Sequence, residues 1–133
     1  MNRKVLKPFI TGLAVIFLGS FIVTFFNLYD TFPHIDKLFH VSGGFIIVWF
    51  FAVLWADYLK QASHFQRFLT LVAIAAFVGV FWEIAEYSTS VYPLSGSVLL
   101  QHYLYIGDIV DTLGDLLADT FGAALAAVIL RLD

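Results

Sequence analysis

The chain has 133 residues, of which 61% are hydrophobic and 13% are charged, and its formal net charge is −3. The charged share is about half that of an ordinary soluble domain, and the mean hydropathy is +0.90. This composition excludes a typical soluble globular domain and predicts a single-domain integral membrane protein, with lipids and not nucleic acid around it. The absence of cysteine excludes disulfides and thiolate metal sites.

Four apolar segments have the length of membrane-crossing helices, close to the ~20 residues that span a hydrocarbon core. They cover about residues 8–28, 35–58, 67–89 and 108–131. The first segment is too long for the apolar region of a signal peptide, so we expect it to be retained as a helix. Between the third and fourth segments, residues 90–107 form a long uncharged aromatic loop, which we expect at the membrane interface or folded over a site. The sequence therefore predicts an all-α, four-helix membrane bundle.

The basic residues are distributed unevenly along this expected topology. Six of the seven lie at the N-terminus, in the second loop or at the C-terminal end, whereas Lys37 falls on the opposite side. Because Lys and Arg concentrate in cytoplasmic loops, this bias predicts a multi-pass membrane protein with both termini in the cytoplasm.

Acidic side chains and one histidine fall inside the expected spans. Counted from the cytoplasmic ends, His40, Glu83 and Asp115 each lie 16 or 17 residues in, which is ~24 Å at 1.5 Å per residue. This depth places all three at one level in the outer half of the membrane. Four aspartates also share one ~80° stripe of the last helix, at positions Asp108, Asp111, Asp115 and Asp119.

Ionisable groups inside a membrane rarely face lipid, so these faces should meet within the bundle. Burying unpaired carboxylates is costly, and protonation, a water-filled cleft or bound cations can each relieve that cost. Carboxylates with one imidazole suit a hard or borderline divalent ion such as Mg²⁺, Mn²⁺, Zn²⁺ or Fe²⁺. We expect one or two such ions, held by His40, Glu83, Glu86, Asp111 and Asp115. A spare carboxylate, Asp119 or Asp36, would then serve as general base.

Simpler interpretations exist for several of these positions. Asp119 can be a helix-bonding or protonated group, Asp108 an N-cap, and Asp36 a cap or a partner of Lys37. Glycines and alanines in the spans are most simply small residues for close helix contact. The phenylalanines and most of the tryptophans are expected to be core or lipid-facing bulk.

Three blocks of sequence carry a family resemblance. "DKLFHVSGGF" (36–45), "FWEIAEY" (81–87) and "GDIVDTLGDLLADTFGA" (107–123) together resemble the YjdF-like, or DUF2238, family of small bacterial inner-membrane proteins. More distantly, the pattern is similar to VanZ-like proteins, whose association with glycopeptide resistance implies cell-envelope substrates. The resemblance covers about residues 34–125 and implies no particular reaction.

The leading hypothesis is a metal-dependent hydrolase or phosphotransferase that acts on a lipid or lipid-linked envelope substrate. One alternative is a proton or divalent-cation transporter, for which four helices make a narrow path unless the chain forms a homo-oligomer. The other is a non-catalytic, metal-stabilised membrane binding protein.

Overall fold

The computed structural model describes residues 3–32, 34–91 and 108–130, and within these ranges the chain forms helices and no strand. The described residues contain four helical spans that are long and apolar enough to cross a membrane. They are Arg3–Phe25, Ile35–Leu54, His64–Ser88 and Ile109–Ile129. The predicted all-α membrane bundle is therefore confirmed. The predicted loop over the site, residues 90–107, lies almost wholly outside the described residues.

The first span is one continuous helix with a change of winding in its middle. It consists of α1 (Arg3–Ala14), the π-helical turn η1 (Val15–Gly19) and α2 (Ser20–Phe25). It begins before the predicted residue 8 and ends before residue 28. It ends there because Asn27 adopts a left-handed conformation, with φ of 52°, which a right-handed helix cannot continue through. A short helix, α3 (Leu28–Thr31), follows.

The other spans begin near their predicted positions. They are formed by α4 (Ile35–Leu54), α6 (His64–Val91) and α8 (Ile109–Ile129), with the short α5 (Ala56–Leu59) after α4. The predicted second span, 35–58, is interrupted at Trp55, whose backbone leaves the helical region. At the start of α8, the Oδ1 atom of Asp108 accepts hydrogen bonds from the backbone N–H groups of Val110 and Asp111, at 2.9 and 3.0 Å. The N-cap interpretation of Asp108 is therefore confirmed.

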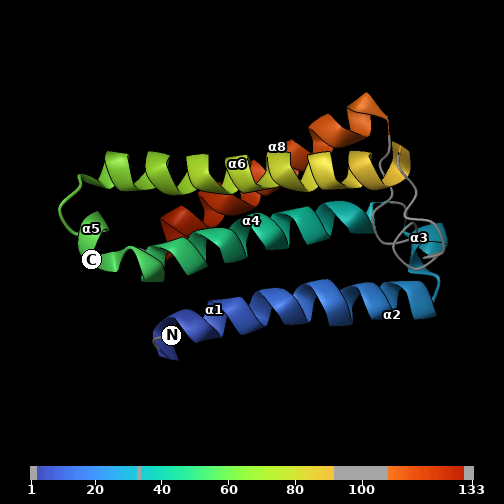
Figure 1. The fold of residues 1–133 in the computed structure, drawn as a ribbon, viewed down its shortest axis with the longest axis horizontal. Coiled ribbons are helices and arrows are strands. Elements are labelled where there is room, and N and C mark those ends of the chain that lie inside the picture. The colour runs from blue at the N-terminus through green and yellow to red at the C-terminus, as the bar shows by residue number, and fades with distance from the viewer. Residues whose placement is uncertain (1–2, 33, 92–107, 131–133) are drawn as a thin grey trace.

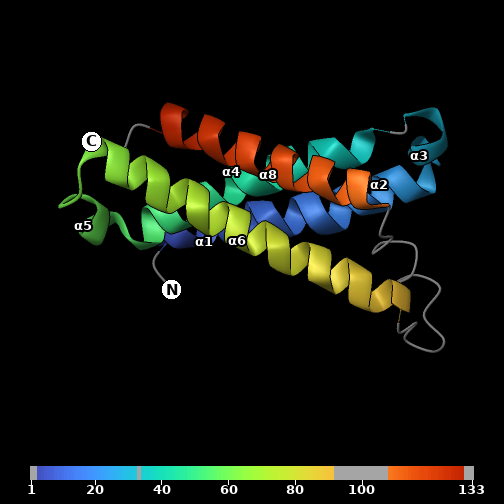
Figure 2. The ribbon, with the colours of Figure 1, turned by 90° about the horizontal axis from the view of Figure 1, so that it is seen from above.

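Helix α4 is the centre of the bundle. It packs against α1 on one side and against α6 and α8 on the other (Figure 1). Seen from above, α6 and α8 diverge toward the end where α8 begins (Figure 2). The start of α1 and the end of α8 lie at the same end of the bundle (Figure 1). The assignment of this end to the cytoplasmic side of the membrane stays a prediction.

The apolar core occupies the half of the bundle that contains the start of α6 and the end of α8. It is built largely from small and medium side chains, namely Val48, Ala52, Leu59, Leu71, Ala75, Ala123 and Ala126. Large apolar side chains such as Phe17, Phe77 and Leu117 are exposed on the outer faces instead. A compact interior with bulky apolar residues outside is expected when the surrounding solvent is lipid. The polar residues gather in the other half of the bundle.

Candidate metal centre

The backbones of α4 and α8 touch where two glycines face the opposite helix. A Cβ atom at Gly44 would overlap the backbone carbonyl of Asp119, and a Cβ atom at Gly122 would overlap the backbone carbonyl of Val41. Larger residues at these two positions would force the helices apart. The prediction that these glycines permit close helix contact is thus confirmed, and the contact aligns the polar face of α4 with the aspartate stripe of α8.

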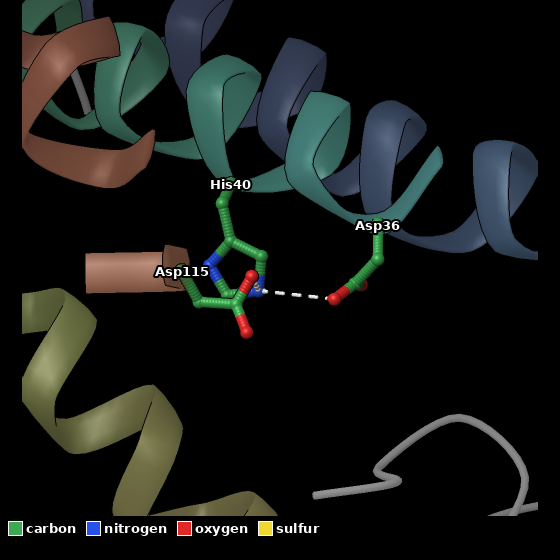
Figure 3. Close-up of side chains that lie close together, drawn as sticks. All are labelled: Asp36, His40 and Asp115. Carbon is green, nitrogen blue, oxygen red and sulfur yellow. Dashed lines mark ion pairs between the residues drawn. The ribbon is translucent and has the colours of Figure 1, made fainter. Parts of the chain in front are cut away.

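Three side chains from these two helices converge within this crossing. The Nε2 atom of His40 lies 3.4 Å from Oδ1 of Asp115 and 3.9 Å from Oδ2 of Asp36 (Figure 3). One ligand atom from each residue falls within 4.8 Å of the others. Zinc bonds nitrogen and oxygen ligands at about 2.0–2.2 Å, so small side-chain rotations would let all three reach one ion. His40 and Asp115 are buried, and Asp36 is partly buried.

Asp119 lies at the opposite ring nitrogen of the same histidine. Its Oδ2 atom is 3.3 Å from Nδ1 of His40, and both side chains are buried. Gly79 of α6 provides room for this carboxylate, because a Cβ atom there would overlap its Oδ2 atom. A carboxylate that accepts the Nδ1–H proton orients the ring and leaves Nε2 available as a ligand. The sequence predicted Asp119 as a general base, whereas its position here is that of a partner to His40.

Lys37 bridges two aspartates of α8. Its Nζ atom donates hydrogen bonds to Oδ1 of Asp111 at 2.5 Å and to Oδ1 of Asp115 at 2.6 Å, and also reaches the backbone carbonyl of Asp111 at 3.2 Å. The Oδ1 atom of Asp115 is therefore shared between Lys37 and His40. Asp111, a predicted metal ligand, interacts with Lys37 and is not part of the group formed by Asp36, His40 and Asp115.

Helix α6 adds two buried carboxylates, Glu83 and Glu86, each about 6–7% exposed. Within the described residues, neither carboxylate oxygen of Glu83 has a hydrogen-bond partner. The hydroxyl of Thr112 is near enough to act on this carboxylate, although it does not reach hydrogen-bond geometry. Glu83 also interacts electrostatically with Asp115 and His40. It therefore lies near enough to the three-residue group for their charges to interact, although it is not a member of that group.

Glu86 lies one turn further along α6 and has a neutral partner on its own helix. The Nε1 atom of Trp82 donates to its Oε1 atom at 2.7 Å. Glu86 interacts electrostatically with Glu83, His40 and Asp36. The sequence analysis treated most tryptophans as bulk and missed this role of Trp82. The signal for this contact in the sequence was the separation of four residues between Trp82 and Glu86, because residues one helical turn apart are neighbours.

Carboxylates outnumber cationic groups in this cluster. We define the acidic cluster as the six carboxylates that the three helices bring together, namely Asp36, Glu83, Glu86, Asp111, Asp115 and Asp119. Lys37 and His40 are the basic groups bonded to it. If every group were ionised, the negative charges would exceed the positive charges by four. Such an excess within a membrane span requires protons or further cations.

Comparison with known proteins gives the family of the chain. A family model described as "Predicted membrane protein (DUF2238)" matches residues 1–132. A Thermotoga maritima protein described as uncharacterized is 31% identical over 122 residues, which cover 87% of this chain and 58% of that protein. The chain thus spans less than two thirds of that relative. No solved structure matches the present chain. Because the family model covers nearly the whole sequence, the chain belongs to the DUF2238 family of predicted membrane proteins.

Proposed function

We propose that this protein binds a divalent metal ion between α4, α6 and α8, and uses it to hydrolyse, or transfer a phosphoryl group from, a lipid or lipid-linked envelope substrate. Asp36, His40 and Asp115 form the ligand core, and Glu83 supplies a further carboxylate. A divalent ion held by these residues would supply Lewis acidity toward a phosphoryl oxygen and would lower the pKa of a bound water.

The observation that carries the proposal is the environment of Glu83. Its carboxylate is 6% exposed and has no hydrogen-bond partner among the described residues. It faces Asp115 and His40, which already offer ligand atoms together with Asp36. A buried carboxylate without a partner is costly in an apolar medium. A cation shared with the neighbouring ligands would remove that cost.

The proposal divides the roles differently from the sequence-based expectation. Asp36 becomes a ligand, because one of its oxygens belongs to the three-residue group. Asp119 becomes a positioning residue, because it contacts His40 at the nitrogen that faces away from Asp115. Glu86 and Asp111 lie at the edge of the site, where Trp82 and Lys37 hold them. They remain candidates for the ligands of a second ion.

The location of the site follows from the charge bias of the loops. With both termini in the cytoplasm, the acidic cluster lies in the outer half of the inner membrane. A site at that depth would meet the head groups of outer-leaflet lipids or of lipid-linked envelope precursors.

The test is metal-dependent turnover by the full chain in lipid nanodiscs. Release of phosphate from a lipid phosphate and a lipid diphosphate is measured with Mg²⁺, Mn²⁺, Zn²⁺ or a chelator. We expect turnover with at least one metal and its loss in Asp115→Asn. The matched control is Asp108→Asn, which makes the same chemical change at the N-cap of the same helix, where Asn caps as well as Asp. Turnover that is the same in the chelator, or in Asp115→Asn, would contradict the proposal.

A second candidate is a non-catalytic, metal-stabilised membrane binding protein, to whose stability the polar network also contributes. The two ion pairs that Lys37 forms with Asp111 and Asp115 support this candidate, because Lys37 already brings a positive charge into the cluster. The two candidates differ in one outcome. A metal-stabilised binding protein would hold the ion in stoichiometric amount and release no phosphate from any lipid substrate.

A further inference from the structure

A cavity of about 190 Å³ lies between the first span, α4 and α6, beside the acidic cluster. An apolar cavity of ~150 Å³ is large enough to hold a benzene molecule, so this cavity can hold a segment of a hydrocarbon chain. Small residues create the space at its wall. These include Gly12 of α1, Gly43 and Gly44 of α4, and Ala75 of α6.

The cavity is polar at one end and apolar at the other. The ionisable residues that line the cavity are Asp36, His40, Glu86 and Asp119. Because α4 runs antiparallel to the first span and to α6 (Figure 1), residues later in α4 lie beside the start of the first span. The close approach of Gly12 to the side chain of Ile46 fixes this alignment. Ile46, Val15 and Val78 therefore line the apolar part. A graded lining of this kind suits an amphiphile.

The cavity reaches the lipid-facing surface between α1 and α6. Both helices pack on α4 and make little contact with each other. Ile16 and Trp82 line the cavity and are nevertheless 43% and 37% exposed. Ile16 belongs to the π-helical turn, a local widening of the helix that is frequent at functional sites. A molecule dissolved in the bilayer could therefore enter sideways.

The charges at the polar end select the head group. The end presents carboxylates and one imidazole, within a cluster whose acids outnumber its bases. An anionic head group would be repelled there, whereas a cation would be attracted. Trp82 lines the same end, and an indole ring binds ammonium groups favourably. We propose that the cavity binds the hydrocarbon chain of an amphiphile whose ammonium head group lies beside Glu86 and Trp82.

This binding site goes beyond the proposed reaction and does not require it. Glu86 and Trp82 lie outside the group formed by Asp36, His40 and Asp115. An ammonium group beside these two residues therefore shares no ligand with an ion held by that group.

The experiment uses three photoreactive alkyl probes with one chain length and one diazirine position, which differ only in their head group. They carry trimethylammonium, hydroxyl or phosphate, and each is incubated with the full chain in nanodiscs, with and without a chelator. Labelled residues are mapped by peptide mass spectrometry. We expect the trimethylammonium probe to label cavity-lining residues about tenfold more than the other two, equivalent to ~1.4 kcal/mol, in both conditions.

Variants of α6 separate cavity binding from partition into lipid. Val78→Phe fills the cavity, and Val80→Phe makes the same change at a position that is 42% exposed and outside the lining. Glu86→Gln removes a charge and keeps an acceptor for Trp82. We expect Val78→Phe and Glu86→Gln to lower labelling and Val80→Phe to leave it unchanged. Equal labelling by the three probes, or labelling that neither Val78→Phe nor Glu86→Gln lowers, would overturn the inference. Metal-dependent preference for the phosphate probe would also overturn it, while supporting the proposed reaction.

Discussion

The Nδ1 atom of His40 lies 3.3 Å from Oδ2 of Asp119, while Nε2 of the same ring faces Asp115 at 3.4 Å. The imidazole is therefore held between two buried aspartates of one helix, four residues apart. When Asp119 accepts the Nδ1–H proton, the lone pair of Nε2 points toward Asp115 and Asp36. In the proposed metal site, Asp119 would therefore be the residue that orients His40 toward the ion.

The first prediction concerns Asp119. Asp119→Asn preserves the shape of the side chain but removes the charge that orients and polarises His40. Loss of such an outer carboxylate typically lowers metal affinity about 10–100-fold. Titration of the metal-depleted protein with Zn²⁺ or Mn²⁺ measures this change, with Asp108→Asn as the control. Unchanged affinity in Asp119→Asn would show that the carboxylate does not act through His40.

The second prediction concerns the Lys37 bridge. Lys37→Met removes the donor to Asp111 and Asp115 and leaves the buried Asp115 carboxylate with less compensation. We expect the free energy of unfolding to fall by about 1–3 kcal/mol in the metal-free protein, seen as a lower midpoint of thermal unfolding in detergent.

The control for this prediction is Lys60→Met. Lys60 forms a comparable bond to Asp57 at 3.0 Å, but both side chains are largely exposed. Such pairs contribute little to stability, so the midpoint should not change. Equal effects of the two variants would mean that the Lys37 bridge is no more than a surface ion pair.

The third prediction compares two adjacent glycines. A Cβ atom at Gly44 would overlap the backbone of Asp119, whereas a Cβ atom at Gly43 meets only Oδ1 of Asp119, at an ordinary 3.7 Å. Gly44→Ala should therefore separate α4 from α8 and weaken both stability and metal binding. Gly43→Ala should be tolerated, because it adds a methyl group at van der Waals distance. Thermal unfolding and metal titration of both variants measure the difference, and similar behaviour of the two would contradict the observed helix crossing.

The sequence predicted the meeting of the polar residues better than their roles. A helix rises a fixed 1.5 Å per residue, so counting from the span ends placed His40, Glu83 and Asp115 at one level. Because exposing ionisable side chains to lipid is costly, the sequence also predicted that the helix faces carrying them meet inside the bundle. The structure brings His40 and Asp115 together and places Glu83 near enough for its charge to interact with both.

The division of roles depends on directions that the residue pattern does not contain. Which ring nitrogen of His40 meets Asp115 and which meets Asp119 depends on the rotation of α4 against α8. That rotation is set by the backbone contact at Gly44 and Gly122. The reach of Lys37 across to α8 depends likewise on a long side chain with many rotamers. Helical spacing fixes the face of a residue, but not the partner that it selects on another helix.

The ends of the first span also could not be predicted from the hydrophobic pattern. Its apolar run continues to Leu28, yet the helix stops before Asn27 because that residue turns into a left-handed conformation. At the other end, basic residues join the helix because their long side chains can reach toward the membrane surface. Local hydropathy predicts neither the left-handed conformation of Asn27 nor the inclusion of the basic residues in the helix.

The most direct test of the central claim is the metal content of the full chain, purified without chelator at neutral pH. Inductively coupled plasma mass spectrometry should find about one divalent ion per chain, and Asp115→Asn should lose it while Asp108→Asn keeps it. Protein that folds normally and contains no stoichiometric metal, before and after incubation with Mg²⁺, Mn²⁺, Zn²⁺ or Fe²⁺, would contradict the account. In that case protons and Lys37 alone would balance the acidic cluster.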